Sequence, residues 1–217
     1  MTRTSLRGLW PLLLLAPLSC GASLSYRVDP DSVHALPVDE RLDLLDSEND
    51  LFAALDRRDD AVQALDDARD AYDRTARQLS TAANDLDRAQ DEHDGQGVTI
   101  GRLAVEEAKA HRRWADRAID LAEDQLDIAS AYVLVAEAQF EKAKAEAVVR
   151  AKVKGASSVN VAKYAAQVKH FLERARGVER DLKEDTADAE KDRSRWADLS
   201  RKLSEMTGGA QGSPWVE

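Results

Sequence analysis

The sequence predicts an all-α protein, an elongated antiparallel three-helix coiled-coil bundle that follows an N-terminal signal segment and a flexible tether. Composition is the first reason. Charged residues make up 33% of the chain and aromatic residues 5%, alanine is abundant, and glycine and proline are sparse, a mixture typical of long helices. Spacing is the second reason, because apolar residues recur every seven positions in three successive segments, as they do along the seam of a coiled coil.

Residues 1–19 have the order of an export signal. Arg3 and Arg7 precede an apolar run over residues 9–18, and small residues follow at 19–22, which matches the basic, apolar and cleavage regions of a signal peptide. The apolar run spans about ten residues, whereas a membrane-spanning helix needs about twenty. We therefore expect residues 1–19 to be removed as a signal peptide rather than to remain as a transmembrane anchor.

Cys20 is the only cysteine of the chain and lies where the apolar run ends, between Ser19 and Gly21. A lone cysteine in an exported chain is a modification site, an intermolecular bridge or a spare thiol. The segment resembles the lipobox of bacterial lipoproteins, which implies that Cys20 is acylated and becomes the first mature residue, and that Gly21 favours delivery to the outer membrane. Pro17 and Leu18 depart from the usual lipobox pair, so cleavage after Ala22, which would discard the cysteine, stays open.

A flexible tether is expected over residues 20–46. This stretch is polar, contains Pro30 and Pro37 and has no helical period, which is typical of a linker. Ser47, with Asp50 three residues later, offers a helix N-cap. We place the start of a three-helix coiled-coil domain there and its end at residue 207.

Three periodic segments make up this domain, each roughly fifty residues or about 75 Å long. The first ends in the glycine-rich stretch 95–101, and the second ends at Gly155. Ser157 or Ser158 then caps the third. Short connections between long helices favour antiparallel neighbours, although one hairpin could also open and complete the bundle between two chains. The glycine-rich residues 208–217 have no period and are expected to form a flexible tail, whose "SPWVE" end could dock on a partner.

The second segment is predicted to be the most buried helix. Its alanines fall on one seven-residue series: Ala108, Ala115, Ala122, Ala129, Ala136 and Ala143. Larger apolar residues lie one position before several of them, which widens the stripe enough to contact two neighbouring helices. In the third segment Asp185 and Asp192 interrupt the seam, where an ion pair with Arg69 or Arg74, or exposure to solvent, is favoured over an ion site. Trp114 and Trp196 have heptad positions and are expected in the core.

The sequence predicts neither an enzyme nor a cofactor or metal site. It has no cysteine cluster for zinc, no Walker loop, no G-x-S-x-G and no dinucleotide-binding glycine motif. His93, within "DEHD", and His111 could approach each other at one hairpin end, but an exposed polar helix end is the preferred interpretation. The net charge of −10, or −12 once Arg3 and Arg7 leave with the signal, argues against nucleic acid and anionic membrane surfaces as partners.

As a whole, the chain is similar to alanine-rich coiled-coil lipoproteins of the Gram-negative cell envelope. The resemblance implies a structural or adaptor protein, held by lipid on the outer membrane and facing the periplasm, that binds an envelope protein or the cell wall. If Cys20 is discarded, the same protein would be secreted to the periplasm. The alternative function is a periplasmic holdase that clamps unfolded clients between helical arms, although the predicted arm tips, "DEHDGQG" and "KGASS", are polar.

Overall fold

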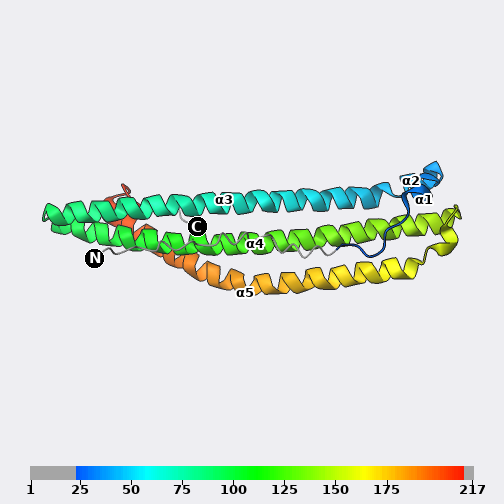
Figure 1. Ribbon diagram of the computed structural model, residues 1–217. Helices are drawn as coiled ribbons and strands as arrows, with labels where there is room; N and C mark the ends of the chain where they lie inside the picture. The colour runs from blue at the N-terminus through cyan, green and yellow to red at the C-terminus, as the bar shows by residue number, and fades with distance from the viewer. Residues whose placement is uncertain (1–22, 213–217) are drawn as a thin grey trace, which may run out of the picture.

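The computed structural model describes residues 23–212, except for the side chains of residues 181 and 183–185. Three long helices dominate it, α3 (Leu45–Asp91), α4 (Gly95–Ala151) and α5 (Val161–Thr207), and the short helices are α1 (Pro30–His34), α2 (Val38–Leu42) and the 3-10 turn η1 (Ala156–Ser158). The described residues contain no strand. The all-α prediction is confirmed, and the chain runs up, down and up through the long helices (Figure 1).

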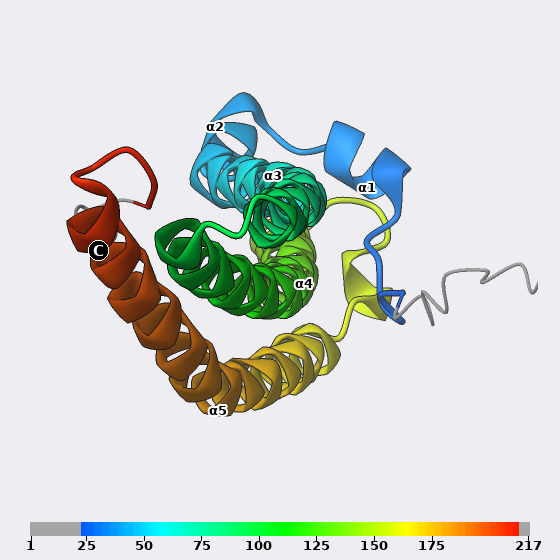
Figure 2. The same cartoon turned by 90° about the vertical axis from the view of Figure 1, so that its left-hand side faces the viewer.

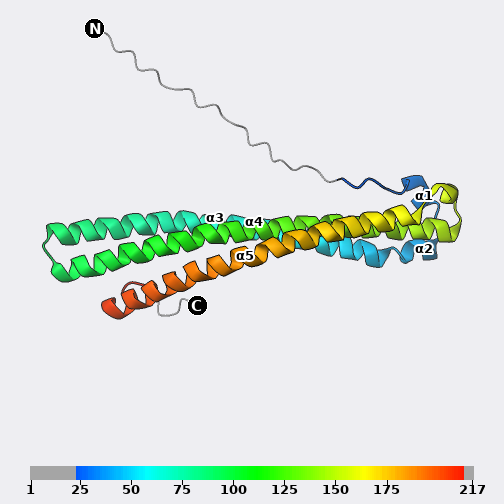
Figure 3. The same cartoon turned by 90° about the horizontal axis from the view of Figure 1, so that it is seen from below.

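Helix α4 is the central element. Extensive packing joins α3 to α4 and α4 to α5, whereas α3 and α5 have no comparable contact within the described part of the chain. Seen end-on, α3 and α5 lie around α4 (Figure 2), and α5 crosses α4 at an angle, so that its C-terminal half diverges from the α3–α4 hairpin (Figure 3). A three-helix bundle around one shared core is therefore not confirmed.

The alanine series accounts for the central position of α4. Ala108, Ala115, Ala122 and Ala136 are buried, and Ala129 and Ala143 are half-buried. Small side chains let helix axes approach closely, and the width of the stripe gives α4 two neighbours. Gly101 allows the same close approach of α3 and α4 near the turn between them, because a Cβ at this position would lie 3.0 Å from the Cα of Leu86.

The helix ends differ in detail from the sequence prediction. Helix α3 begins at Leu45, with no side-chain cap from Ser47. Asn160 caps α5 in place of Ser157 or Ser158, because its side chain accepts a hydrogen bond from the backbone N–H of Ala162 at 3.1 Å. The α3–α4 turn is closed by Asp94, whose carboxylate accepts from the N–H of Gln96 at 3.1 Å. Local capping chemistry thus shifts the predicted ends by a few residues.

Residues 23–44, called here the N-terminal segment, depart from the expected flexible tether. Four of their apolar side chains are buried: Leu24, Val28, Leu36 and Leu44. Leu24 packs with Phe171 and Ala138, and the other three pack with Val148 and Tyr164. The scattered apolar residues have no helical period but together cover α4 and α5, so the tether prediction fails over this range.

Polar contacts fix the same segment. The backbone N–H of Val28 donates to Glu141 Oε2 at 2.7 Å in a buried site. Tyr26 exchanges two hydrogen bonds with the amide of Gln167, at 2.9 and 3.1 Å, and the Tyr164 hydroxyl donates to the carbonyl of Arg27 at 3.2 Å. These partners lie on α4 and α5, far along the sequence, so only the tertiary fold provides them.

The predicted seam aspartates have different surroundings from those expected. Asp192 is half-buried and pairs with Arg117 of α4 at 4.0 Å, not with Arg69 or Arg74. Arg69 instead pairs with Glu123 of α4 at 3.0 Å. The side chain of Asp185 lies outside the described residues. The structure therefore supplies an ion pair for one aspartate, across the α4–α5 contact.

Candidate functional site

Two cavities lie on α4 between α3 and α5, and together we call them the trough. The middle cavity, about 860 Å³, is lined by residues 54–64 of α3, 125–132 of α4 and 179–186 of α5. The distal cavity, about 1110 Å³, lies toward the α3–α4 turn and is lined by α3 from residue 74, by 97–111 of α4, by 196–203 of α5 and by Gln211 and Gly212. Each cavity is thus bounded by all three long helices.

The distal cavity has an aromatic wall. The rings of His111, Trp114 and Trp196 lie within 22° of parallel, with centroids 4.1 Å apart for His111–Trp196 and 4.9 Å apart for Trp114–Trp196. His111 and Trp114 are one turn apart on α4, and Trp196 comes from α5. The two tryptophans were expected in the core. Both are half-buried, so the stack joins two helices, and of its three rings those of His111 and Trp196 line the cavity.

Glu107 is a half-buried acid next to this wall. The indole Nε1–H of Trp196 donates to Glu107 Oε1 at 2.7 Å. Burial raises the pKa of Glu107, and hydrogen bonds from Trp196 and Ser200 oppose that change because they favour the ionised carboxylate. The hydrogen bonds also fix the orientation of the Trp196 ring.

The surroundings of His111 favour its neutral form. Burial lowers its pKa from the ordinary value of 6.5, because the charged imidazolium loses hydration there. His93 does not join it in a cluster, since its Nδ1 lies 3.0 Å from the carbonyl of Asp91 in its own turn. Among residues 23–212, no group of three or more His, Cys, Asp or Glu side chains is placed to hold a metal ion.

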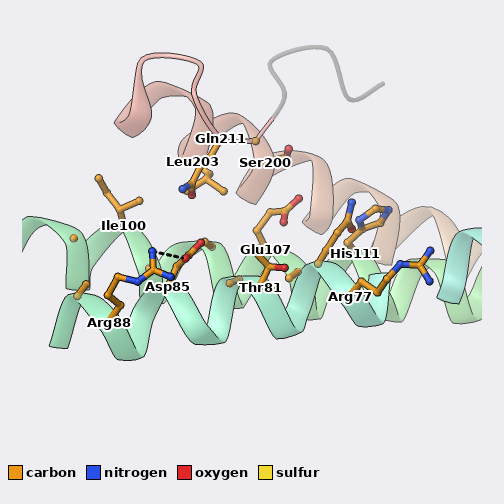
Figure 4. Close-up of a pocket in the computed structure, with 18 of the residues that line it drawn as sticks. Arg77, Thr81, Asp85, Arg88, Ile100, Glu107, His111, Ser200, Leu203 and Gln211 are labelled. Atoms are coloured by element: carbon orange, nitrogen blue, oxygen red, sulfur yellow. Dashed lines mark ion pairs between the residues drawn. The ribbon is translucent and has the colours of Figure 1, made fainter. Parts of the chain in front are cut away.

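Arginines line the α3 edge of the distal cavity. Arg88 pairs with Asp85 at 3.6 Å, whereas Arg74 and Arg77 are exposed and have no ion pair with any described residue. Figure 4 shows Arg77 and Arg88 on α3 below the Glu107 and His111 side chains of α4, with Ser200, Leu203 and Gln211 above. Asp85, Glu92 and Glu107 also line this cavity, so its positive charge is confined to the exposed guanidinium groups of Arg74 and Arg77.

The middle cavity is different in chemistry. Half of its lining residues are apolar: Ala54, Ala61, Ala64, Ile128, Ala129 and Leu182. The other half are polar or charged: Arg57, Asp60, Gln125, Tyr132, Glu179 and Thr186. At its α4–α5 side the Tyr132 hydroxyl donates to Glu179 Oε1 at 2.9 Å, and this bond raises the pKa of Tyr132. Small side chains on facing helices leave room for the side chains of a further helix.

Sequence reasoning identified part of this site. Trp114, Trp196 and the alanines were placed by their heptad positions, but Glu107 was missed. The sequence pattern could have identified Glu107, because it lies seven residues before Trp114 and so falls on the widened apolar stripe of α4. The predicted lipidation site, Cys20, lies outside the described residues.

Together the two cavities offer apolar, aromatic and charged surface. None of the helices within residues 23–212 combines the length and apolar character that crossing a membrane requires. The chain matches no family model, no curated protein and no solved structure.

Proposed function

We propose that the protein is a non-enzymatic adaptor of the bacterial cell envelope, a helical rod that binds an α-helical segment of another envelope component. The observation that carries this proposal is the middle cavity. Helix α4 is contacted by α3, by α5 and by the N-terminal segment, and the trough is a face of α4 that lies open between α3 and α5. A helix laid there would complete the packing around α4.

The lining of the middle cavity suits a helix. Residues 54–64 of α3 cover about 15 Å, or roughly three helical turns. Ala61, Ala64 and Ala129 present only methyl groups there, so the axis of a bound helix could approach closely and fill the cavity with larger apolar side chains. The partner is therefore expected to present an apolar stripe at helical spacing.

The lipid anchor belongs to the same proposal and rests on the sequence. Acylation of Cys20 would hold the mature protein at the outer membrane. Leu24, only four residues later, packs against the flank of α4 at Ala131, Val135 and Ala138. Four residues span at most about 14 Å, so an anchored rod would be held along its flank, close to the membrane.

The anchor is tested by Cys20→Ala. We expect the variant to move from the membrane fraction to the soluble periplasmic fraction, with the mature wild-type chain beginning at an acylated Cys20. A soluble wild-type protein whose first residue is Ser23 would contradict the anchor and leave the adaptor proposal to be judged by the next experiment.

The adaptor role is tested by a photoreactive amino acid at Ala64, which lines the middle cavity. Val62 is the matched control, since it is exposed on the same helix but lines neither cavity. In intact cells we expect one discrete adduct from position 64 and a much weaker one from position 62. The cross-linked partner peptide should lie in an amphipathic helix. Equal labelling at the two positions would contradict the proposal.

One observation favours a holdase as a second candidate function. Apolar side chains are exposed near the end of the rod where α2 meets α3: Val38, Leu42, Leu45 and Phe52, with Val38 64% exposed. If they hold unfolded clients, the wild-type protein should suppress aggregation of an unfolded outer-membrane protein. Leu42→Ser combined with Phe52→Ser should abolish that effect. A spread of adducts at position 64, in place of one, would also support this function over the adaptor.

A further inference from the structure

The chain that follows α5 turns back into the trough. Helix α5 ends at Gly208, which has a left-handed backbone with φ of 61°. Thr207 then holds the turn, because its hydroxyl accepts a hydrogen bond from the N–H of Gln211 at 3.0 Å while it donates to the carbonyl of Leu203 in α5 at 2.8 Å. Gln211 and Gly212 line the distal cavity, so the last described residues lead into it.

Gly212 is fixed closely against α5. A Cβ at this position would lie 2.4 Å from the carbonyl oxygen of Ser200, and the φ of Gly212 is 72°. Both the close approach and the backbone conformation require glycine. The direction in which the chain leaves α5 is thus set by packing next to the aromatic wall.

The residues that follow have side chains complementary to the cavity. They are Ser213, Pro214, Trp215, Val216 and Glu217, and they lie outside the described residues. The cavity presents apolar surface from Ile100, Ala104 and Leu203, the aromatic wall at Trp196, and the arginine edge of α3. An indole buries about 150–250 Å² when it packs, and a carboxylate gains from an unpaired guanidinium beside it.

We propose that residues 213–217 dock in the distal cavity, with Trp215 and Val216 on its apolar floor and Glu217 beside Arg77. Five residues reach at most about 18 Å, and Gly212 already lines the cavity, so attachment keeps the segment at high effective concentration. This inference goes beyond the proposed function and does not depend on it, because the partner helix is assigned to the middle cavity and this segment to the distal one.

Disulfide trapping in the full chain tests the proposal. Cys20→Ser leaves the introduced pair as the only thiols, and Val216→Cys is combined with Thr81→Cys, an exposed position that lines the distal cavity. The matched control pairs Val216→Cys with Ala64→Cys. Ala64 is seventeen residues away on α3, about 25 Å along the helix, and a disulfide requires Cα atoms within about 7 Å.

We expect an intramolecular disulfide in the 81/216 protein, formed at least about tenfold faster than in the 64/216 protein, given the required Cα approach. Equal rates in the two proteins, or no disulfide in either, would overturn the proposal. Disulfide-linked dimers of the 81/216 protein would also overturn it, because they would mean that the segment reaches the cavity of a second copy. Unchanged helical circular dichroism confirms that both proteins are folded.

The chemistry of docking is tested in the same 81/216 protein. Trp215→Ala should slow disulfide formation about tenfold, since burial of one aromatic side chain supports an effect of that size, whereas Ser213→Ala should leave the rate unchanged. Arg77→Glu should slow it about twofold to fivefold, the range of an exposed ion pair, and Glu217→Arg should restore it. No effect of Trp215→Ala would contradict the assignment of the cavity to this segment.

Failure here is distinguishable from failure of the adaptor proposal. Photo-cross-linking at Ala64 reports on the middle cavity and uses the partner, whereas disulfide trapping uses the purified chain alone. A partner adduct at position 64 together with no 81/216 disulfide would overturn only the docking inference. The opposite result would overturn only the adaptor.

Discussion

The two halves of the rod are built on the same helices but are covered differently. In the proximal half, which includes the α4–α5 turn, the N-terminal segment packs over α4 and α5, and Val148, Ala145 and Ala147 are fully buried. In the distal half, α5 diverges from the hairpin and the distal cavity is open beside the stacked rings of His111, Trp114 and Trp196. The comparison teaches that the N-terminal segment ties the helices together in the proximal half, whereas, among the described residues, the distal half has no such cover and keeps a large cavity between the helices.

The largest effect is expected in the proximal half, from Phe171→Ala. Phe171 is buried with Leu24, Val135 and Ala138, so its removal leaves a cavity where α5, α4 and the N-terminal segment meet. We expect a loss of about 3–5 kcal/mol in the free energy of unfolding, the usual cost of deleting a buried aromatic side chain. Urea unfolding followed by circular dichroism measures it. A loss below about 1 kcal/mol would mean that this half is not the stabilising one.

Glu141→Ala should release the N-terminal segment at a smaller cost. The N–H of Val28 would lose its buried acceptor and Lys144 would lose its ion-pair partner. An unsatisfied buried donor costs about 1–3 kcal/mol. Hydrogen exchange at Val28 should become faster. The control is Glu137→Ala, because the Arg27–Glu137 pair is long at 3.8 Å and exposed, and such pairs contribute about 0–1 kcal/mol. Equal effects of the two substitutions would contradict this role for Glu141.

Two leucine substitutions on α4 sharpen the comparison. Ala122 is buried in the helix contact, so Ala122→Leu should cost about 1–3 kcal/mol by overpacking. From the seven-residue alanine series alone, Ala129→Leu would be expected to destabilise the protein by the same amount. In the structure, however, Ala129 is half-buried and lines the middle cavity. A leucine there enters open space, so Ala129→Leu should change stability by less than about 1 kcal/mol and weaken the adduct at position 64. Thermal unfolding measures the difference between the two variants.

The smallest effect is a pH dependence in the distal half. Because burial lowers the pKa of His111 below 6.5, the unfolded chain binds this proton more readily than the folded chain. The stability that neutral His111 contributes to the fold is therefore fully present above the pKa that His111 has in the unfolded chain. It is lost as the pH falls below that value. His111→Phe keeps an aromatic ring in the stack and removes the proton site. Between about pH 7.5 and about pH 5.5, the wild-type Tm should fall more than the variant Tm.

The raised pKa of Glu107 acts in the opposite direction. Its folded form takes up a proton more readily, so this group favours the folded state on acidification and disfavours it as the pH rises. The effect is common to both proteins and cancels in the difference. An equal fall of the two Tm values would contradict the assignment of acid sensitivity to His111.

The sequence by itself determined the long helices, their up, down and up order and the central place of α4. The helices and the central place of α4 follow from local periodicity, since a seven-residue series repeats the same face of one helix over many turns. Their order follows from the short connections between them. Trp114, Trp196 and the buried alanines of the candidate site were predictable for the same reason, and Glu107 falls on the same series.

Tertiary structure alone decided the rest. Leu24, Val28, Leu36 and Leu44 have no period, and their segment is held by groups such as Glu141, which is 113 residues from Val28 in the chain. Periodicity likewise gives α4 a stripe for two neighbours but does not say where those neighbours diverge. The crossing angle of α5 sets that point, and with it the trough, because side-chain volumes along the whole contact determine how two helices pack.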